Sequence, residues 1–242
     1  MVLPIHLGGE IAGVVETLGE GVSGLEEGNA VYGITKTGGF AEYAVAQAAD
    51  MARKPANLDF VHTAAISLGA LTAWQAMFDV AKLASGQRLL VTNSSGGVGF
   101  LAVQLAKAHG VHVSAMASGW NEEYVRSLGV DEFTDYTRQP FEHVARDMDV
   151  VFDTVGGDTF QRAFVTLKKG GFLVAAVAFP KNEAQQHGVG AERVMCKPNA
   201  GQLASIRELV EAGKVRARVG TVLPLAEIRQ AFELSEGGVA AD

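Results

Sequence analysis

A strand that turns directly into a helix is encoded in residues 88–110, and this segment constrains the fold more than any other part of the chain. The apolar run Leu89-Leu90-Val91 is typical of a parallel strand covered on both faces. Apolar residues at helical spacing between Val98 and Ala106 predict a helix, and residues 111–116 predict a second strand. The order strand, turn, helix, strand indicates a βαβ unit, whose turn presents free amide groups and a positive helix end to an anion.

The glycines of this turn favour a dinucleotide over a simple anion. Against the fingerprint G-x-G-x-x-G, Ser94 occupies the first position while Gly96 and Gly99 fill the second and third. A chain with 29 glycines also allows an ordinary turn, but the second strand at βαβ distance makes that alternative weaker. We therefore expect a pyrophosphate to bind along the turn, at Ser94, Ser95, Gly96, Gly97, Val98 and Gly99.

Composition excludes several classes of partner. The chain has 242 residues, is 48% hydrophobic and carries a net charge of −7, with its 20 basic residues dispersed, so we expect no nucleic-acid partner. Apolar runs stay below the roughly 20 residues that cross a bilayer, and Met1 is not followed by signal-peptide features. The single cysteine, Cys196, fits a reducing compartment, so we expect a cytoplasmic protein without a membrane span.

Two patterns divide the chain. Short β-prone runs at residues 10–16, 30–34 and 40–45, separated by glycine-rich turns, predict a small antiparallel β unit. From Val61 onward, helices and strands alternate, which predicts an α/β fold with a doubly wound parallel sheet. The expected strands are residues 88–92, 111–116, 132–134, 149–152 and 172–177, and the expected helices are residues 62–83, 98–106, 121–128, 159–168, 202–212 and one through Phe232.

Short motifs spread over nearly the whole chain resemble the medium-chain dehydrogenase/reductase superfamily, in its zinc-free quinone oxidoreductase branch. They are GEIAGVV (9–15), GNAVYG (28–33), GFAEY (39–43), LTAW (71–74), SGGVG (95–99), QLAK (104–107), DY (135–136), FDTVG (152–156) and LVEAG (209–213). The resemblance implies a Rossmann domain beside a partial GroES-like β domain. It divides the chain into a GroES-like substrate domain at 1–62, a dinucleotide-binding domain at 63–198, and a segment at 199–242 that returns to the substrate domain.

The same resemblance implies an activity. Enzymes of this branch move hydride from NADPH to quinones or to the β-carbon of enones, and the hydride chemistry belongs to the cofactor. Positioning of the nicotinamide then carries much of the catalysis, so no catalytic residue is assigned. Two alternatives stay open: an enoyl reductase of polyketide or fatty-acyl synthesis, and a catalytically silent dinucleotide-binding protein.

Zinc ligation is unsupported by the residues. Zinc enzymes of the superfamily carry Gly-His-Glu, whereas this chain has Gly8-Gly9-Glu10, and structural zinc in relatives needs four clustered cysteines. The six histidines show no ligand spacing, so we expect no metal site.

Cofactor preference is read at the end of the second strand. An NAD site places Asp or Glu there for the ribose 2′-hydroxyl, but residues 117–121 (ASGWN) contain no carboxylate, which favours NADP(H). Relatives bind the 2′-phosphate with a basic residue near this turn and a tyrosine after the third strand; Tyr136 matches the tyrosine, while Trp120 and Asn121 replace the cation. The resemblance places Ser118, Asn121 and Tyr136 at the adenosine end. At the nicotinamide half it places Thr72, Val155, Ala176 and Val177.

Both ends of the chain depart from the family pattern. Gly9-Glu10 lies well inside the family's substrate domain, so several first strands have no counterpart, and residues 237–242 replace the usual last strand. Either the sequence is a fragment, which we favour, or its open sheet edges pair with another chain. Relatives join their cofactor sheets edge to edge, so we expect a homodimer through the sheet edge near residues 172–179.

Overall fold

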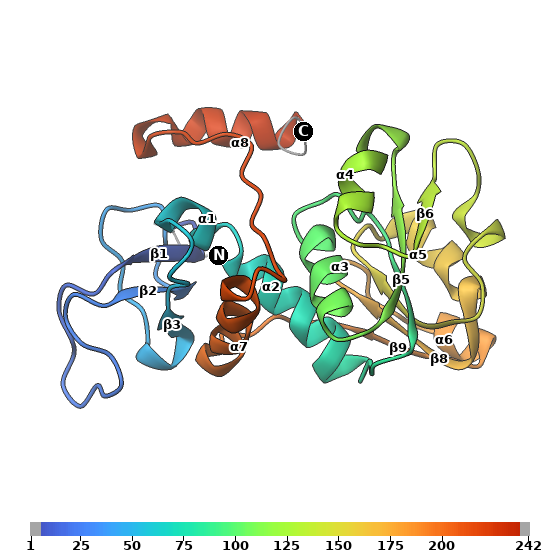
Figure 1. Cartoon of the computed structure of the whole chain (residues 1–242), viewed down its shortest axis with the longest axis horizontal. Helices are drawn as coiled ribbons and strands as arrows, with labels where there is room; N and C mark the ends of the chain where they lie inside the picture. Colours follow the sequence, from blue (N-terminus) through green and yellow to red (C-terminus); the bar gives the residue numbers. More distant parts are fainter. Residues whose placement is uncertain (1–5, 238–242) are drawn as a thin grey trace. The chain divides into compact units, whose positions relative to one another are not determined.

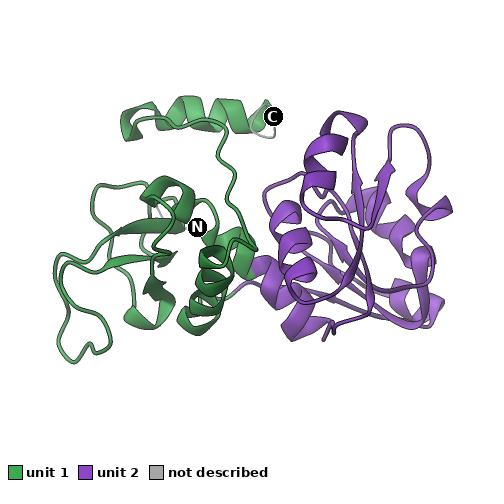
Figure 2. Ribbon diagram, in the orientation of Figure 1, with its two compact units in different colours: residues 1–71, 197–242 green, residues 72–196 purple. Residues whose placement is uncertain are grey.

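A computed structural model describes residues 6–237, and these divide into two compact units (Figure 2). Unit 1 comprises residues up to 71 together with those from 197 onward, and unit 2 comprises residues 72–196. The chain therefore leaves unit 1, builds unit 2 without interruption, and returns. The domain boundaries expected at 62 and 198 stay a prediction about the family's domains.

Unit 2 is built on a six-stranded parallel sheet (Figure 1), which confirms the predicted α/β class. The strands lie in the order β6-β5-β4-β7-β8-β9, so the strand order reverses between β4 and β7. Their bounds are β4 (Arg88–Val91), β5 (His112–Ala117), β6 (Glu132–Asp135), β7 (Met148–Asp153), β8 (Leu167–Ala175) and β9 (Gly190–Arg193). The helices between them are α3 (Gly99–Ala108), α4 (Glu122–Ser127), α5 (Gly157–Ala163) and α6 (Glu183–His187).

The core of unit 2 follows from the apolar strands. Leu90, Val151 and Leu173, on three neighbouring strands, belong to one buried cluster. The aromatic rings of Phe160 and Phe164 complete this cluster and meet edge to face, with centroids 5.1 Å apart. Burial of both sheet faces explains why these strands read as continuous apolar runs.

Two sequence predictions in unit 2 need correction. The helix expected over residues 159–168 ends at Ala163, a 3-10 turn covers residues 164–166, and β8 already begins at Leu167, which pairs with Met148 of β7. Residues 172–175 are not the sheet edge, because β9 pairs with them on the side away from β7. The edge strand on this side of the sheet is therefore β9, and a dimer through this edge would use residues 190–193.

Unit 1 contains a three-stranded antiparallel sheet of β1 (Glu10–Val14), β2 (Ala30–Ile34) and β3 (Met51–Arg53). The strand expected at residues 40–45 was wrong: this stretch forms bends and leaves Tyr43 and Val45 exposed. Hydroxyl groups of Thr35 and Thr37 both donate to the carbonyl oxygen of Val45, each at 2.7 Å. These bonds hold the segment as a loop, and β3 pairs with β2 in its place.

The helices outside the βα units also differ from the prediction. In place of one helix over residues 62–83, the chain forms α1 (Phe60–Ala64), α2 (Ser67–Trp74) and a π-helical turn over Gln75–Val80. Later come α7 (Ala200–Glu211) and α8 (Ile228–Glu236), while residues 219–224 adopt no regular structure. Residues 238–242, where no closing strand is expected, lie outside the described part. No helix within residues 6–237 is long and apolar enough to cross a membrane.

Helix α7 packs against the sheet of unit 1 through polar contacts. The buried Tyr32 hydroxyl donates to the carbonyl oxygen of Leu203 at 2.7 Å. The side-chain amide of Asn57 donates to the carbonyl oxygen of Val210 at 3.0 Å, and the amide of Ala56 donates to Glu211 Oε1 at 2.9 Å. The segment after residue 197 is thus fastened to strands and loops formed by the first 60 residues.

Candidate dinucleotide-binding site

The turn after β4 is held by a buried serine. Ser94 is fully buried, and its hydroxyl donates to the carbonyl oxygen of Val91 at 2.9 Å while accepting from the amide of Met116 at 3.1 Å. Its own amide donates to the Met116 carbonyl oxygen at 2.8 Å. Ser94 therefore joins the ends of β4 and β5, and its hydroxyl is occupied within the protein.

Different physical reasons explain each glycine of the turn. A Cβ at Gly99 would lie 2.1 Å from the carbonyl oxygen of Asn93, and one at Gly96 would lie 2.5 Å from the Asn93 side-chain nitrogen. Asn93 itself has φ +50°, a left-handed conformation that asparagine tolerates better than most residues. A Cβ at Gly97 would meet nothing within 4 Å. Gly96 and Gly99 thus allow the turn to close, while Gly97 borders open space.

Helix α3 begins at this open space. It spans ten residues from Gly99, and no side chain caps its start at Val98. An uncapped helix start leaves amide hydrogens and the positive end of the helix dipole for an anion. The turn therefore fits a diphosphate in both shape and charge, because the backbone is bare where the ligand would approach.

A second set of polar groups lies at the ends of β4 and β7. Asp153 is fully buried; it accepts from the Thr92 hydroxyl at 3.0 Å and from the amide of Gly156 at 2.9 Å. Burial raises the pKa of Asp153, and these hydrogen bonds, with a third from Val155, offset only part of the effect. Gly156 has φ +78° and ψ −163°, a region open essentially to glycine alone. Asp153 and Gly156 together fix the turn that carries Val155, because the carboxylate of Asp153 binds the backbone of that turn.

A third set lies at the ends of β5 and β6. Asn121 donates to the Ser118 hydroxyl oxygen at 3.2 Å, and Tyr136 is about half exposed. Asp135 faces the backbone of Gly119, because a Cβ at Gly119 would lie 2.5 Å from its Oδ2. Asp135 is thus a polar group of this edge that sequence reasoning missed. Its position directly after the strand expected at residues 132–134 and directly before Tyr136 was the available signal.

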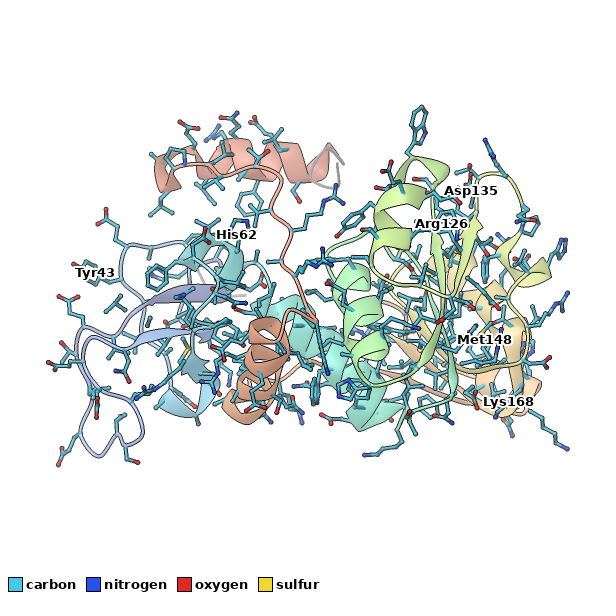
Figure 3. All side chains as sticks on the ribbon, viewed as in Figure 1. Tyr43, His62, Arg126, Asp135, Met148 and Lys168 are labelled. Atoms are coloured by element: carbon cyan, nitrogen blue, oxygen red, sulfur yellow. The ribbon has the colours of Figure 1, made fainter. Side chains whose placement is uncertain are left out.

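Most of the predicted site residues follow the carboxyl ends of parallel strands. These ends meet at one edge of a parallel sheet. Figure 3 shows Asp135, at the end of β6, far from Lys168, near the start of β8. The edge with Asp135 collects the predicted residues Ser94, Ser95, Gly96, Gly97, Val98, Gly99, Ser118, Asn121, Tyr136, Val155, Ala176 and Val177. Thr72 lies in α2 and is half-buried, and its contact with nicotinamide stays a prediction.

Residues 6–237 contain no group of three or more His, Cys, Asp or Glu side chains placed to hold a metal ion. Glu10, which follows Gly9, instead accepts from the amide of Leu68 at 2.9 Å. Removal from water raises the pKa of Glu10, and the bond from Leu68 works against that rise.

Unit 1 contains a cavity of its own, with a volume of about 650 Å³. It is lined by β1, by the loop after it and by residues 41–46, among them the exposed Tyr43 and Val45. None of the predicted dinucleotide contacts lines this cavity. The cavity and the phosphate turn are therefore separate features of the chain.

Comparison with known proteins decides the family. The family model described as alcohol dehydrogenase GroES-like domain matches residues 1–56, and the one described as zinc-binding dehydrogenase matches residues 128–241. The chain is 32% identical over 250 residues to a probable zinc-binding oxidoreductase, mitochondrial, from Arthroderma benhamiae, covering 95% of this chain and 75% of that protein. The chain belongs to the medium-chain dehydrogenase/reductase superfamily, in its quinone oxidoreductase-like branch. This medium-chain dehydrogenase/reductase is thus an oxidoreductase, and the resemblance drawn from its motifs is confirmed.

Two further proteins show how similar this superfamily member is to relatives in sequence and in structure. An NADPH-dependent alkenal/one oxidoreductase, chloroplastic, from Arabidopsis thaliana is 34% identical, covering 97% of this chain and 61% of that protein. The structure of the quinone oxidoreductase from Coxiella burnetii aligns with a TM-score of 0.88 at 31% identity, covering 98% of this chain and 77% of that one. The fold of this chain is accordingly that of the superfamily, with a parallel Rossmann-like sheet and a small antiparallel GroES-like sheet.

Proposed function

We propose that this chain is an NADP(H)-dependent oxidoreductase that transfers hydride from nicotinamide to a quinone or an α,β-unsaturated carbonyl without zinc. The observation that carries the proposal is the uncapped start of α3 beside the open face of Gly97. A dinucleotide fits there, because bare amide hydrogens meet its diphosphate. The absence of a carboxylate from residues 117–121 favours the 2′-phosphorylated cofactor.

The residues of the chain bind and orient in this proposal. Ser94 fixes the phosphate turn through its hydrogen bonds to Val91 and Met116, and Asp153 fixes the turn that contains Val155. A bound nicotinamide supplies the hydride. Thr72, Val155, Ala176 and Val177 are proposed to hold the nicotinamide half, and no side chain is assigned as acid or base.

The compartment and assembly belong to the same proposal. The single cysteine supports the cytoplasm, although relatives carry mitochondrial and chloroplastic names. A homodimer is proposed through the sheet edge, now at β9. Zinc independence rests on Gly9 standing where zinc enzymes of the superfamily carry histidine.

The test mixes purified protein with NADPH and 1,4-benzoquinone and follows absorbance at 340 nm, with an enone such as 3-buten-2-one in parallel. We expect NADPH consumption that depends on the acceptor and is unchanged after dialysis against a chelator. Metal analysis of the same sample is expected to find less than one zinc in ten chains. Binding of NADPH without consumption favours the silent protein, and turnover only of acyl-carrier enoyl thioesters favours the enoyl reductase.

A further inference from the structure

The proposed NADP(H) site lacks a cation at the expected place, because Trp120 and Asn121 occupy the turn after β5. We propose that Arg138, on the loop after β6, supplies that cation and makes the chain select the 2′-phosphate of NADP(H). This inference rests on the proposed function, since it assumes a dinucleotide across the strand ends. Selection between NADP(H) and NAD(H) would then depend on the loop after β6, whereas relatives carry their basic residue in the turn after β5.

The two loops lie together because their strands pair in register. Ala117 of β5 is the partner of Asp135 of β6, and the amide of Tyr136 donates to the carbonyl oxygen of Ala117 at 3.3 Å. The loop of Arg138 and the turn of Ser118 therefore start at the same level of the sheet. A 2′-phosphate near Ser118 would lie beside both.

The carboxylate of Asp135 connects these loops, and its negative charge is already engaged by hydrogen bonds within them. Its Oδ1 accepts from the amide of Thr137 at 2.9 Å and from the Thr137 hydroxyl at 2.7 Å. The hydroxyl of Thr137, backbone amides including that of Gly119, and the nearby Arg138 hold the pKa of Asp135 below its usual value against partial desolvation. With its side chain only 12% exposed, this carboxylate is committed to the turn and is a poor acceptor for a ribose hydroxyl.

Arg138 is placed to change partners. Its Nε lies 3.5 Å from Asp135 Oδ2, a long contact, and its side chain is 85% exposed. An exposed pair of this kind holds its members weakly. A planar guanidinium binds phosphate through two parallel hydrogen bonds, which is a stronger arrangement. Asp135 therefore holds the Arg138 guanidinium near the end of β6, but weakly enough that a phosphate can take its place as the partner.

Arg126, at the end of α4, provides a matched comparison near the same edge (Figure 3). Its Nε lies 2.8 Å from Glu122 Oε1, and its guanidinium lies over the Phe133 ring at 5.4 Å. Arg126 carries the same charge but is held by two partners. Removing it changes the net charge equally without removing the proposed phosphate contact.

The experiment measures binding to the full chain, so that activity is not needed. Wild-type protein, Arg138→Gln, Arg138→Lys and Arg126→Gln are titrated with NADPH, NADH and 2′,5′-ADP by calorimetry. We expect Arg138→Gln to raise the Kd for NADPH and 2′,5′-ADP by about tenfold, the size of one charge-assisted hydrogen bond, with NADH unchanged. We expect Arg138→Lys, which keeps the charge but not the planar two-bond geometry, to raise the Kd for NADPH less than Arg138→Gln does, and Arg126→Gln to change it less than about twofold.

Two results overturn the assignment of Arg138. One is a Kd for NADPH and NADH that rises equally in Arg138→Gln, and the other is an equal loss in Arg126→Gln, which would show a diffuse charge effect. Failure of the proposed function looks different, because wild-type protein would then bind neither NADPH nor NADH. Circular dichroism of each variant confirms that the fold is kept.

Discussion

The hydroxyl of Thr92 donates to Oδ1 of Asp153 at 3.0 Å and so ties the ends of β4 and β7, the two strands between which the strand order reverses. Thr92 also accepts from the amide of Thr154 at 2.9 Å, and the Thr154 hydroxyl donates to the Thr92 carbonyl oxygen at 2.8 Å. Parallel strands diverge beyond this point, and cofactor sites form in the resulting crevice. These bonds hold the ends of β4 and β7 together next to Val155, one of the proposed nicotinamide contacts.

Replacing Thr92 tests this brace. Thr92→Val keeps the shape but leaves the buried carboxylate of Asp153 and the amide of Thr154 each without one hydrogen-bond partner. We expect a loss of about 1–3 kcal/mol in the free energy of unfolding, measured as a lower urea midpoint with an unchanged slope. Thr92→Ser retains the hydroxyl and is expected to lose less, so equal losses in the two variants would contradict the argument.

Substitutions at two of the glycines in the phosphate turn, Gly99 and Gly97, are expected to have different effects. Gly99→Ala forces a Cβ against the Asn93 backbone, so we expect a loss of several kcal/mol or failure to fold. Gly97→Ala meets open space, so the protein is expected to fold normally and to bind NADPH at least tenfold more weakly. Thermal unfolding and a binding titration of both variants separate the two effects, and tight NADPH binding by Gly97→Ala would remove the diphosphate from this position.

Asp149 contributes stability that acid should remove. Burial raises its pKa, but hydrogen bonds from Lys168 and from the amide of Arg88 outweigh that effect and hold the pKa below its usual value. A carboxyl with a lowered folded pKa stabilises the fold above its unfolded pKa and stops doing so as the pH falls through the folded pKa. Asp149→Asn is expected to lose about 1–2 kcal/mol at pH 7 and much less near pH 2. Urea unfolding at both pH values measures the difference.

Asp153 should show the opposite sign. Its folded pKa is raised, so its protonated form favours the fold, and that contribution disappears as the pH rises from below the unfolded value through the folded one. In a carbon-13 NMR titration, the carboxyl carbon of Asp153 is expected to titrate above the usual aspartate value and that of Asp149 below it. The reverse order would contradict the burial argument.

Tyr32 is expected to stabilise unit 1 through a single bond. Its ring is fully buried, and burial raises the pKa of its hydroxyl far above the usual tyrosine value. Tyr32→Phe leaves the carbonyl oxygen of Leu203 without that donor, so we expect a loss of about 1–2 kcal/mol by urea unfolding. Tyr43→Phe, which alters an exposed ring, serves as the control. A wild-type midpoint in Tyr32→Phe would show that the bond contributes little.

Local patterns predicted the parts of the fold in which neighbouring residues decide the structure. The β4, α3 and β5 segments are continuous in sequence, so apolar periodicity and glycine spacing were sufficient there. The run at residues 40–45 has the composition of a strand, but the hydroxyls of Thr35 and Thr37 bind the Val45 carbonyl oxygen and hold it as a loop. Strands β3 and β9 have only three and four residues, and neither contains a continuous apolar run like the one that identified β4.

The same distinction applies to the candidate site: its local motif could be predicted, whereas its contacts between distant residues could not. The phosphate turn is a local motif and could be located from its glycines. The contact of Asp135 with Gly119 depends on the register of β5 and β6, which no run of neighbouring residues specifies. Thr92 was passed over for a similar reason, because its partner Asp153 lies 61 residues away.

The interrupted path of unit 1 has a consequence during synthesis. Residues 72–196 leave the ribosome as one uninterrupted stretch and have all their partners at hand, so they can fold while translation continues. The Tyr32 hydroxyl meanwhile lacks its hydrogen-bond acceptor, the carbonyl oxygen of Leu203, which lies 171 residues further along the chain. The first sheet lacks its contact with α7 until residue 203 has emerged, and nascent chains stalled before that point should be cleaved by protease on the amino-terminal side of residue 72 while the central stretch resists.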